Sequence, residues 1–155
     1  MRKAAVFVLI ALLAAATGVF AEKGGGWAAG IEGSLNISTG SGLPVAAMFT
    51  LHTPQFPVMF GFGADVALNI GITADYWLAH GTLTNIFDWY AGVGAYAVLP
   101  TPLAIGARIP VGLQSWPFGQ KLEVFLEGAP AIGISLIPTG FDWHLQAAIG
   151  LRYWF

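Results

Sequence analysis

The sequence predicts an all-β protein: an eight-stranded antiparallel up-and-down transmembrane β-barrel that follows a cleaved signal peptide. Charged residues make up 9% of the chain and apolar residues 56%, whereas about 25% of the residues in an ordinary soluble domain are charged. After the N-terminal segment, Gly, Pro and polar residues interrupt the chain too often for a transmembrane helix. Apolar and polar residues alternate instead, as they do in strands. In lipid, a chain of this kind satisfies its backbone by closing into a barrel.

The N-terminus has the pattern of a secretory signal. Arg2 and Lys3 precede an apolar run over residues 4–13, and Val19-Phe20-Ala21 is a small-x-small cleavage pattern. We expect a signal peptide over residues 1–21 and one barrel domain over residues 22–155. A membrane anchor is the alternative, but the apolar run is short for a spanning helix.

The expected mature chain is acidic and has no cysteine. Four Lys and Arg remain against eight Asp and Glu in residues 22–155, a net charge of −4. No basic surface for nucleic acid is therefore predicted. Without cysteine, neither a disulfide framework nor a thiolate metal site can form.

The C-terminal stretch, residues 143–155, shows the strand alternation most completely. Its odd-numbered residues are all apolar, from Trp143 to Phe155, and the even-numbered ones include His144, Gln146 and Arg152. Such a strand has one apolar face along its whole length. In a membrane barrel that face would meet lipid, and the polar face would line the lumen.

The first half of the chain divides into strands in the same way. A strand over 27–37 is followed by a Ser- and Gly-rich loop over 38–44, and a second strand over 43–52 ends at the Pro-containing segment 53–57. In both strands alternate residues are apolar. These two strands are expected to form the first antiparallel pair.

From Val58 to Leu78 every even-numbered residue is apolar. One strand of that length would span roughly 70 Å, more than twice a bilayer core of about 30 Å, so the chain must reverse. The apolar residues are even-numbered on both arms, which requires a three-residue loop, because a two-residue loop would switch the apolar set to odd numbers. We therefore predict a turn at Asn69-Ile70-Gly71, with Gly71 in the left-handed conformation.

The second half supplies four more strands, and Pro110 interrupts one of them at a position that suits a bulge or a weakly paired site. Predicted strands cover 87–99, 103–114, 122–136 and 143–155, with turns at 80–84, 100–102, 116–119 and 138–140. Aromatic residues are expected to form girdles at the two rims. Trp143 is assigned to one rim, and the other rim is assigned six aromatic residues: Trp27, Trp89, Trp116, Phe118, Tyr153 and Phe155.

The inward faces carry most of the charged side chains. They are Glu32, Asp65, Asp75, Asp88, Arg108, Lys121, Glu123, Glu127, His144 and Arg152. From the sixth strand through the eighth to the first, the signs alternate between neighbouring strands, in the order Arg108, Glu123 with Glu127, Arg152 and Glu32. We therefore predict an ion-pair network in the lumen. Its members are Glu32, Asp65, Arg108, Glu123, Glu127 and Arg152. The network is either a selectivity constriction or, as we favour, a polar plug, because side chains fill the lumen of an eight-stranded barrel.

The terminal Leu151-Arg152-Tyr153-Trp154-Phe155 resembles the signal that barrel-assembly machinery reads in outer-membrane proteins. With the signal peptide and the strand count, the mature chain resembles the small OmpA/OmpX-type barrels. The run 106–113, residues 122–127 and the last strand are similar to small uncharacterised barrels of spirochaete outer membranes. The chain departs from OmpA in lacking a periplasmic peptidoglycan-binding domain, and from OmpX in lacking long protruding strands.

These patterns lead to one functional expectation and one rival. We expect an integral protein of the outer membrane of a diderm bacterium, a monomer with a structural or narrow porin-like role. Its expected partners are outer-membrane lipid and, through the Phe155 strand, the barrel-assembly machinery; no catalytic residue, cofactor or metal is predicted. The rival is a soluble lipocalin-like barrel around a small hydrophobic ligand. A lipid-modifying enzyme is disfavoured, since no Gly-x-Ser-x-Gly elbow occurs.

Overall fold

The computed structural model describes residues 26–37 and 45–155, so the expected signal peptide (1–21) and the expected loop over 38–44 lie outside the described residues. All the regular structure described is β. The strands are β1 (Ala28–Asn36), β2 (Val45–Thr53), β3 (Phe56–Asp65), β4 (Ile70–Thr82), β5 (Asp88–Leu99), β6 (Leu103–Arg108), β7 (Val111–Ser115), β8 (Leu122–Ile137) and β9 (Thr139–Trp154). Within this part of the chain, no helix has the length and apolar character needed to cross a membrane.

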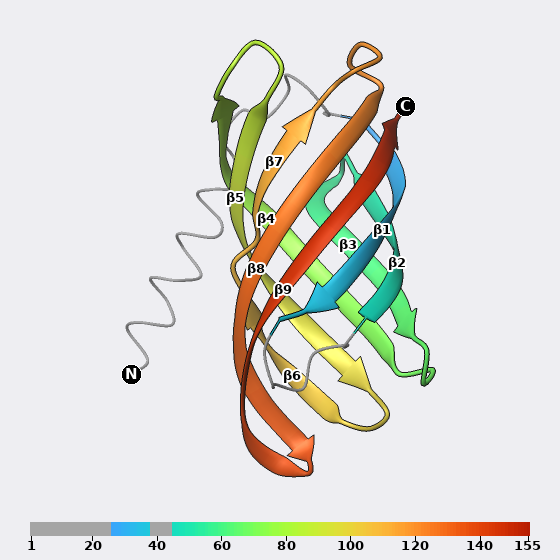
Figure 1. The fold of residues 1–155 in the computed structure, drawn as a ribbon, viewed down its shortest axis with the longest axis vertical. Coiled ribbons are helices and arrows are strands. Elements are labelled where there is room, and N and C mark those ends of the chain that lie inside the picture. Colours follow the sequence, from blue (N-terminus) through green and yellow to red (C-terminus); the bar gives the residue numbers. More distant parts are fainter. Residues whose placement is uncertain (1–25, 38–44) are drawn as a thin grey trace.

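The strands form one closed antiparallel ring (Figure 1). Apart from β6 and β7, strands that follow one another along the chain are paired, and β1 pairs with β9 to close the ring. β6 and β7 are two halves of one ribbon, because both pair with β5 on one side and with β8 on the other. The ring therefore has eight members, and the prediction of eight antiparallel strands is confirmed.

Pro110 causes the break between β6 and β7. Proline has no N–H and cannot donate to a neighbouring strand. Its carbonyl still accepts a 2.8 Å hydrogen bond from Gly92, and the Ile109 N–H donates to the Pro130 carbonyl at 3.0 Å. The ribbon thus stays paired on both sides of the proline, as the prediction of a weakly paired site requires.

The strands run obliquely around the ring. Glu32 of β1 has a cross-strand partner on β2, and the series of partners continues around the ring through β3, β4, β5, β6 and β8 to Gly140 on β9. On its other side, Glu32 pairs directly with Gly150 of β9. One circuit therefore shifts the register by ten residues, from 140 to 150. For eight strands this shift corresponds to a tilt of about 40° from the ring axis.

The turn predicted at residues 69–71 is wrong in position but right in length. Asp65 and Asn69 close a three-residue loop, with the Asp65 N–H donating to the Asn69 carbonyl at 3.1 Å. The left-handed residue is Leu68, with a φ of 64°. Gly71 lies inside β4 and pairs with Gly63. As predicted from the three-residue loop, the even-numbered residues stay on the same face in both arms.

β4 is longer than predicted because it contains a bulge. The pairing with β5 shifts between Trp77 and Ala79, so Leu78 is an extra residue. The strand then continues to Thr82 instead of turning at residue 80. The connection to β5 follows at residues 83–87.

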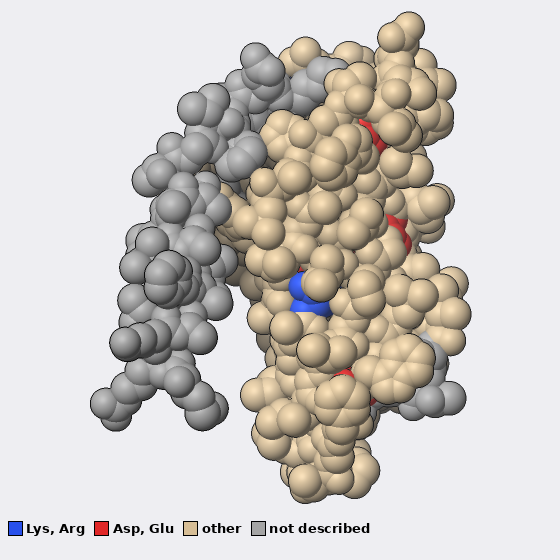
Figure 2. All heavy atoms as spheres, turned by 90° about the vertical axis from the view of Figure 1, so that its left-hand side faces the viewer, with Lys and Arg blue, Asp and Glu red and all other residues tan. Residues whose placement is uncertain are grey.

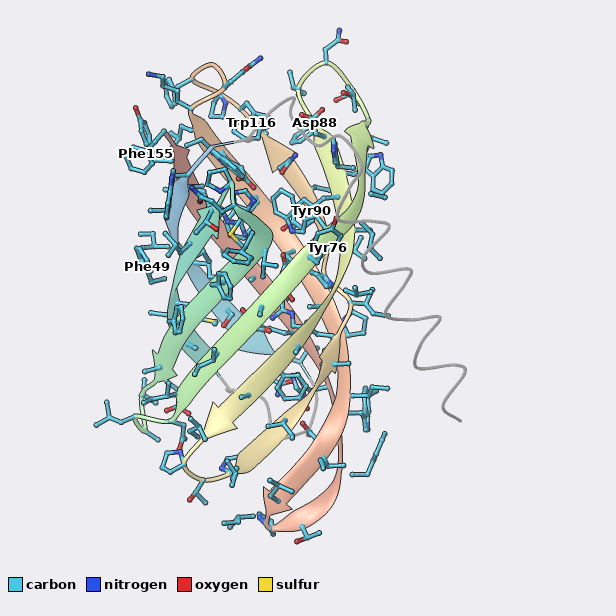
Figure 3. All side chains as sticks on the ribbon, turned by 180° about the vertical axis from the view of Figure 1, so that it is seen from behind. Phe49, Tyr76, Asp88, Tyr90, Trp116 and Phe155 are labelled. Atoms are coloured by element: carbon cyan, nitrogen blue, oxygen red, sulfur yellow. The ribbon has the colours of Figure 1, made fainter. Side chains whose placement is uncertain are left out.

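The apolar faces of the strands point outward and the polar faces inward, as predicted. Ile31 and Ile149 are 64% and 62% exposed, whereas Arg108 and Glu127 are 4% and 6% exposed. Figure 2 shows one outer face, on which charged atoms form only a few small spots. Figure 3 shows Phe155 directed away from the ring and Tyr90 directed into it.

Trp116 differs from its predicted place in a rim girdle. Its ring lies 5.9 Å from the ring of Trp154 and packs against the buried cluster of Ala28, Met59 and Trp154. The residue has therefore joined the interior at the end where the two termini of the ring meet. Trp27, Trp143, Tyr153 and Phe155 are exposed.

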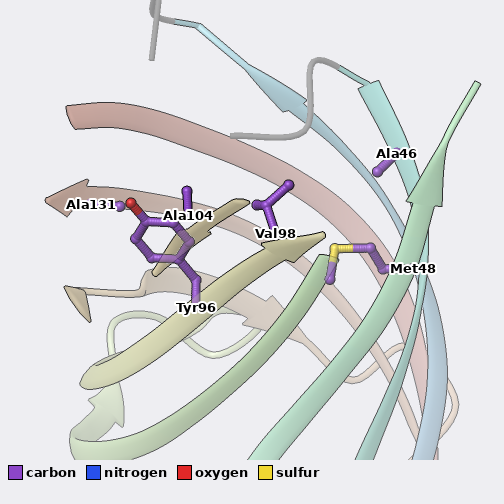
Figure 4. Packing of buried hydrophobic residues seen from close by; sticks show 6 residues of the cluster. All are labelled: Ala46, Met48, Tyr96, Val98, Ala104 and Ala131. Atoms are coloured by element: carbon purple, nitrogen blue, oxygen red, sulfur yellow. The ribbon is translucent and has the colours of Figure 1, made fainter. Parts of the chain in front are cut away.

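The interior also contains an apolar layer (Figure 4). It consists of Ala46, Met48, Tyr96, Val98, Ala104 and Ala131. Four of these six side chains are Ala or Val, which leaves room for the Tyr96 ring between the walls. The layer borders the charged groups described below, since Ala131 pairs with Arg108 across the strands and the Tyr96 hydroxyl donates to Asp142.

One half of the ring is taller than the other. β1, β2 and β3 have 9, 9 and 10 residues, whereas β8 and β9 have 16 each. In Figure 1 the β8–β9 hairpin extends beyond the β3–β4 turn at the same end of the ring. The end of this hairpin is apolar on its outside, with Ile134 and Phe141 50% and 75% exposed.

Candidate functional site

The charged interior is the candidate site, and its first part is built around Arg108 at the end of β6. The Arg108 guanidinium pairs with the Glu127 carboxylate of β8, and its Nε lies 3.1 Å from Asp75 Oδ1 of β4. Its Nη1 donates to Gln146 Oε1 of β9 at 2.6 Å. The Tyr90 hydroxyl of β5 donates to Glu127 Oε2 at 2.7 Å. This Arg108 cluster therefore links five strands across the ring.

The second part is built around Arg152 of β9, whose side chain is 1% exposed. Its Nη1 donates to Glu123 Oε1 at 2.7 Å, and its Nη2 lies 4.0 Å from Glu32 Oε2 of β1. The Trp154 indole N–H donates to the other Glu123 oxygen at 2.7 Å. The guanidinium carbon lies 3.5 Å from the centre of the Phe125 ring. This Arg152 cluster joins β1, β8 and β9, where the first and last strands close the ring.

Glycines on the inner faces make room for the large side chains of both clusters. A Cβ on Gly112 of β7 would overlap the Tyr90 ring, and a Cβ on Gly150 of β9 would lie 2.5 Å from Phe125. Each ring belongs to the residue that pairs with the glycine across the strands, Tyr90 with Gly112 and Phe125 with Gly150. The strand glycines thus determine where aromatic rings cross the interior.

A third polar group lies nearer the β8–β9 turn. The Tyr96 hydroxyl donates to Asp142 Oδ2 at 2.6 Å, and His144 Nδ1 lies 3.3 Å from the same oxygen. The rings of Tyr96 and His144 are 4.8 Å apart in an edge-to-face arrangement. Sequence reasoning missed Asp142, because it assigned that residue to the loop before the last strand. The alternation that places His144 and Gln146 inward extends back to Asp142 and could have identified it.

A small cavity borders this third group. It measures about 20 Å³, and its walls include Met48, Thr73, Tyr96, His144 and Gln146. A volume of this size holds about one water molecule. Four of these five side chains can hydrogen-bond to such a water.

Several buried polar atoms of the interior have no hydrogen-bond partner in the protein. They include Thr50 Oγ1, Gln114 Oε1 and Ser135 Oγ. Each of these residues is at most 6% exposed. Such groups are usually satisfied by protein or by ordered water.

Five of the six residues predicted for the network lie in the two clusters: Glu32, Arg108, Glu123, Glu127 and Arg152. The structure adds Asp75 to the Arg108 cluster. Sequence reasoning had placed Asp75 on the inward face without a partner, since the pattern shows which face a residue occupies but not which residues meet across the ring. Lys121, also predicted to face inward, is exposed beyond the start of β8.

Asp65 is not part of either cluster. It stands in the β3–β4 turn at the rim, where its carboxylate accepts hydrogen bonds from the Asn69 side-chain amide at 2.9 Å and from the backbone N–H groups of Asn69 and Ala67 at 2.9 and 2.8 Å. The Asn69 amide, and then the two backbone donors, lower the pKa of Asp65 below its ordinary value. Its role is to hold the turn.

Comparison of the chain with protein-family models, with curated proteins and with solved structures gave no match. Of the resemblance to OmpA/OmpX-type barrels, only the coarse fold is therefore supported. That fold is an all-β antiparallel sheet in a ring of eight hydrogen-bonded strands. No family follows from it.

The described part of the chain contains no group of three or more His, Asp or Glu side chains arranged to hold a metal ion. His52 Nδ1 lies 2.9 Å from the Gly26 carbonyl, and His144 contacts Asp142. What the interior offers chemically is a set of buried, paired charges.

Proposed function

We propose that the chain is an integral outer-membrane protein whose ring crosses the bilayer, with a structural role or a narrow permeability path through a largely filled lumen. One observation carries this proposal: large apolar side chains cover the outside, while the ion pairs lie inside. Soluble proteins rarely expose contiguous apolar patches of more than a few hundred Å². In lipid the same surface is favourable, and the closed ring leaves no unpaired strand edge.

The dimensions of the short side of the ring fit this proposal. The outward residues on and beside β1 run from Trp27 to Ile37. At about 3.3 Å per residue and a tilt of about 40°, they cover roughly 25 Å along the ring axis. The apolar band of outer-membrane barrels is also about 25 Å tall.

The soluble lipocalin-like alternative would need the opposite arrangement. A small hydrophobic ligand requires an apolar interior, whereas Arg108, Arg152 and their carboxylate partners occupy the middle of this ring. It would also need a well-charged exterior. No observation favours this alternative.

Lysine substitutions on the outer surface test the proposal. Ile149→Lys places a charge on the outer face of β9 opposite Gly33, near the middle of the β1–β9 pairing, and Val66→Lys places one in the β3–β4 turn, where Val66 is 94% exposed. In a bilayer, lysine near the midplane costs about 2–4 kcal/mol and lysine near the interface about 0–1 kcal/mol. We expect Ile149→Lys to lower stability in phosphatidylcholine vesicles, as measured by urea unfolding, and Val66→Lys to leave it nearly unchanged.

The same preparation shows whether the protein inserts. Folded protein in vesicles should resist protease and migrate differently on gels with and without heating. Equal stability of the two lysine variants, or a monomeric protein that stays in water without detergent, would contradict the proposal.

A further inference from the structure

The buried charges of the ring are not balanced. The two clusters contain four buried carboxylates, Glu32, Asp75, Glu123 and Glu127, and two guanidinium groups, Arg108 and Arg152. The clusters therefore carry two more acidic than basic groups. In the part of the chain that the structure describes, the only lysine, Lys121, is exposed and does not offset them.

The acidic character continues toward both ends of the interior. Asp88 at the start of β5 is 7% exposed, and Asp142 near the opposite end is 2% exposed. Asp142 meets Tyr96 and His144. In the described part of the interior, buried carboxylates thus outnumber buried guanidinium groups, and His144 beside Asp142 is a further buried basic side chain.

Neutral oxygen atoms without protein partners lie at the same levels. Gln114 pairs across the strands with Asp88. Thr50 is close to Arg152, since a Cβ on Gly30 would contact both side chains. Ser135 lies on the inner face of β8, two residues along from Gly133, which pairs with Asp142. Their free oxygens are buried acceptors that water or a cation can satisfy.

An excess of negative charge in a low-dielectric interior is costly unless positive charge compensates it. The compensating charge must come from outside the described side chains, as protons or small metal cations. Anions are repelled by the same field. The cavity beside His144, of about 20 Å³, is too small for anything larger than water or a bare small cation.

We infer that the interior of the ring takes up small cations, either protons or alkali-metal ions, and that cations rather than anions cross it. This inference rests on the proposed function, because a path exists only if the ring spans a bilayer. It identifies what the path carries. Glu32 is central to it, since Arg152 has a closer partner in Glu123 and Glu32 therefore adds to the excess.

The test uses the full chain inserted in planar bilayers and in vesicles of phosphatidylcholine. A KCl gradient across the bilayer measures the reversal potential, and a pH-sensitive dye inside the vesicles measures proton uptake. We expect a K⁺ permeability about tenfold or more above that of Cl⁻, or a proton flux without Cl⁻ flux. The first result identifies alkali-metal ions, and the second identifies protons.

Two variants locate the effect. Glu32→Gln keeps the side-chain volume and removes one excess charge, and it should lower the cation preference or the proton flux. Asp65→Asn removes a carboxylate held in the β3–β4 turn and should leave both unchanged. Gel migration with and without heating shows whether each variant has folded and inserted.

Three results would overturn the inference: equal K⁺ and Cl⁻ permeability, a preference for Cl⁻, or inserted protein that passes neither K⁺ nor protons. In each case insertion itself would still support the proposed function. Failure of the unsubstituted chain to insert would instead overturn the proposed function, and the inference with it.

Discussion

Replacing Arg152 by methionine should destabilise the ring more than most single substitutions. The change removes the partner of Glu123, which is 0% exposed and lies 2.7 Å from Arg152 Nη1. Only the Trp154 indole N–H would still donate to that carboxylate among the contacts described. Breaking a buried ion pair by removing one partner costs about 3–5 kcal/mol. The loss of the guanidinium above Phe125 adds to this, by about 2 kcal/mol for a desolvated cation–π contact.

A double-mutant cycle separates the ion pair from general damage. Glu123→Gln alone should cost about 1–3 kcal/mol, because Gln keeps the shape and Arg152 still lies 4.0 Å from Glu32. The double variant Arg152→Met with Glu123→Gln leaves no unpaired buried carboxylate at this position. It should therefore cost less than the sum of the single changes, by about 1–3 kcal/mol.

Equilibrium unfolding in urea, followed by tryptophan fluorescence in vesicles, measures the four stabilities. Gel migration with and without heating is a second probe of folding, and it checks that the fluorescence change reports the same unfolding transition. If Arg152→Met were within about 0.5 kcal/mol of the unsubstituted protein, or if the two single effects simply added, the Arg152 cluster would not be the buried, coupled pair described above.

Two further predictions concern the glycines and the β3–β4 turn. Gly112→Ala should lower stability by about 1–3 kcal/mol, because the new methyl group meets the Tyr90 ring. A methyl group added at Gly33 on the outer face has nothing within 4 Å, so Gly33→Ala should be nearly neutral. Equal urea midpoints for the two variants would refute this account of Gly112. Asp65→Ala should unfold at lower urea than the unsubstituted protein at pH 7, because the turn loses its acceptor. The pKa of Asp65 is lower in the folded protein than its ordinary 3.8, so its contribution is present above that value and lost as the pH falls through the folded pKa. A difference between the two proteins that stayed constant down to pH 2 would contradict the assignment.

Much of the fold follows from the alternation alone. The period of two assigns the residues from Trp143 to Trp154 to the two faces of β9, and the structure agrees. The alternation also gives the length of the β3–β4 loop, because the apolar residues are even-numbered both before and after the chain reverses. The position of that loop was missed by three residues. The sequence favours glycine as the left-handed residue, but the three hydrogen bonds accepted by Asp65 hold Leu68 in that conformation instead.

The candidate site was harder to predict than the fold. The pattern places Arg108, Glu127 and Asp75 on inner faces, yet it contains no information about which of them meet across the ring. That depends on the register shift around the ring, which comes from the turns and from the bulge after Trp77. Asp65 has the same inward parity as Asp75. Asp65 lies at the end of β3 and Asn69 follows four residues later, so the Asp65 carboxylate hydrogen-bonds within the turn instead.

If the ring crosses a bilayer as proposed, its unequal strand lengths have a consequence for the surrounding lipid. From Leu122 to Leu136 the outer face of β8 covers roughly 35 Å along the ring axis, about 10 Å more than the face of β1. No bilayer of uniform thickness matches both sides. The acyl chains beside β8 and β9 must stretch, or the ring must lean, and each ångström of mismatch costs a fraction of a kcal/mol. Two molecules that turned their tall sides toward each other would share one stretched patch of lipid, so the shape of the ring alone would draw copies together without any direct contact between them.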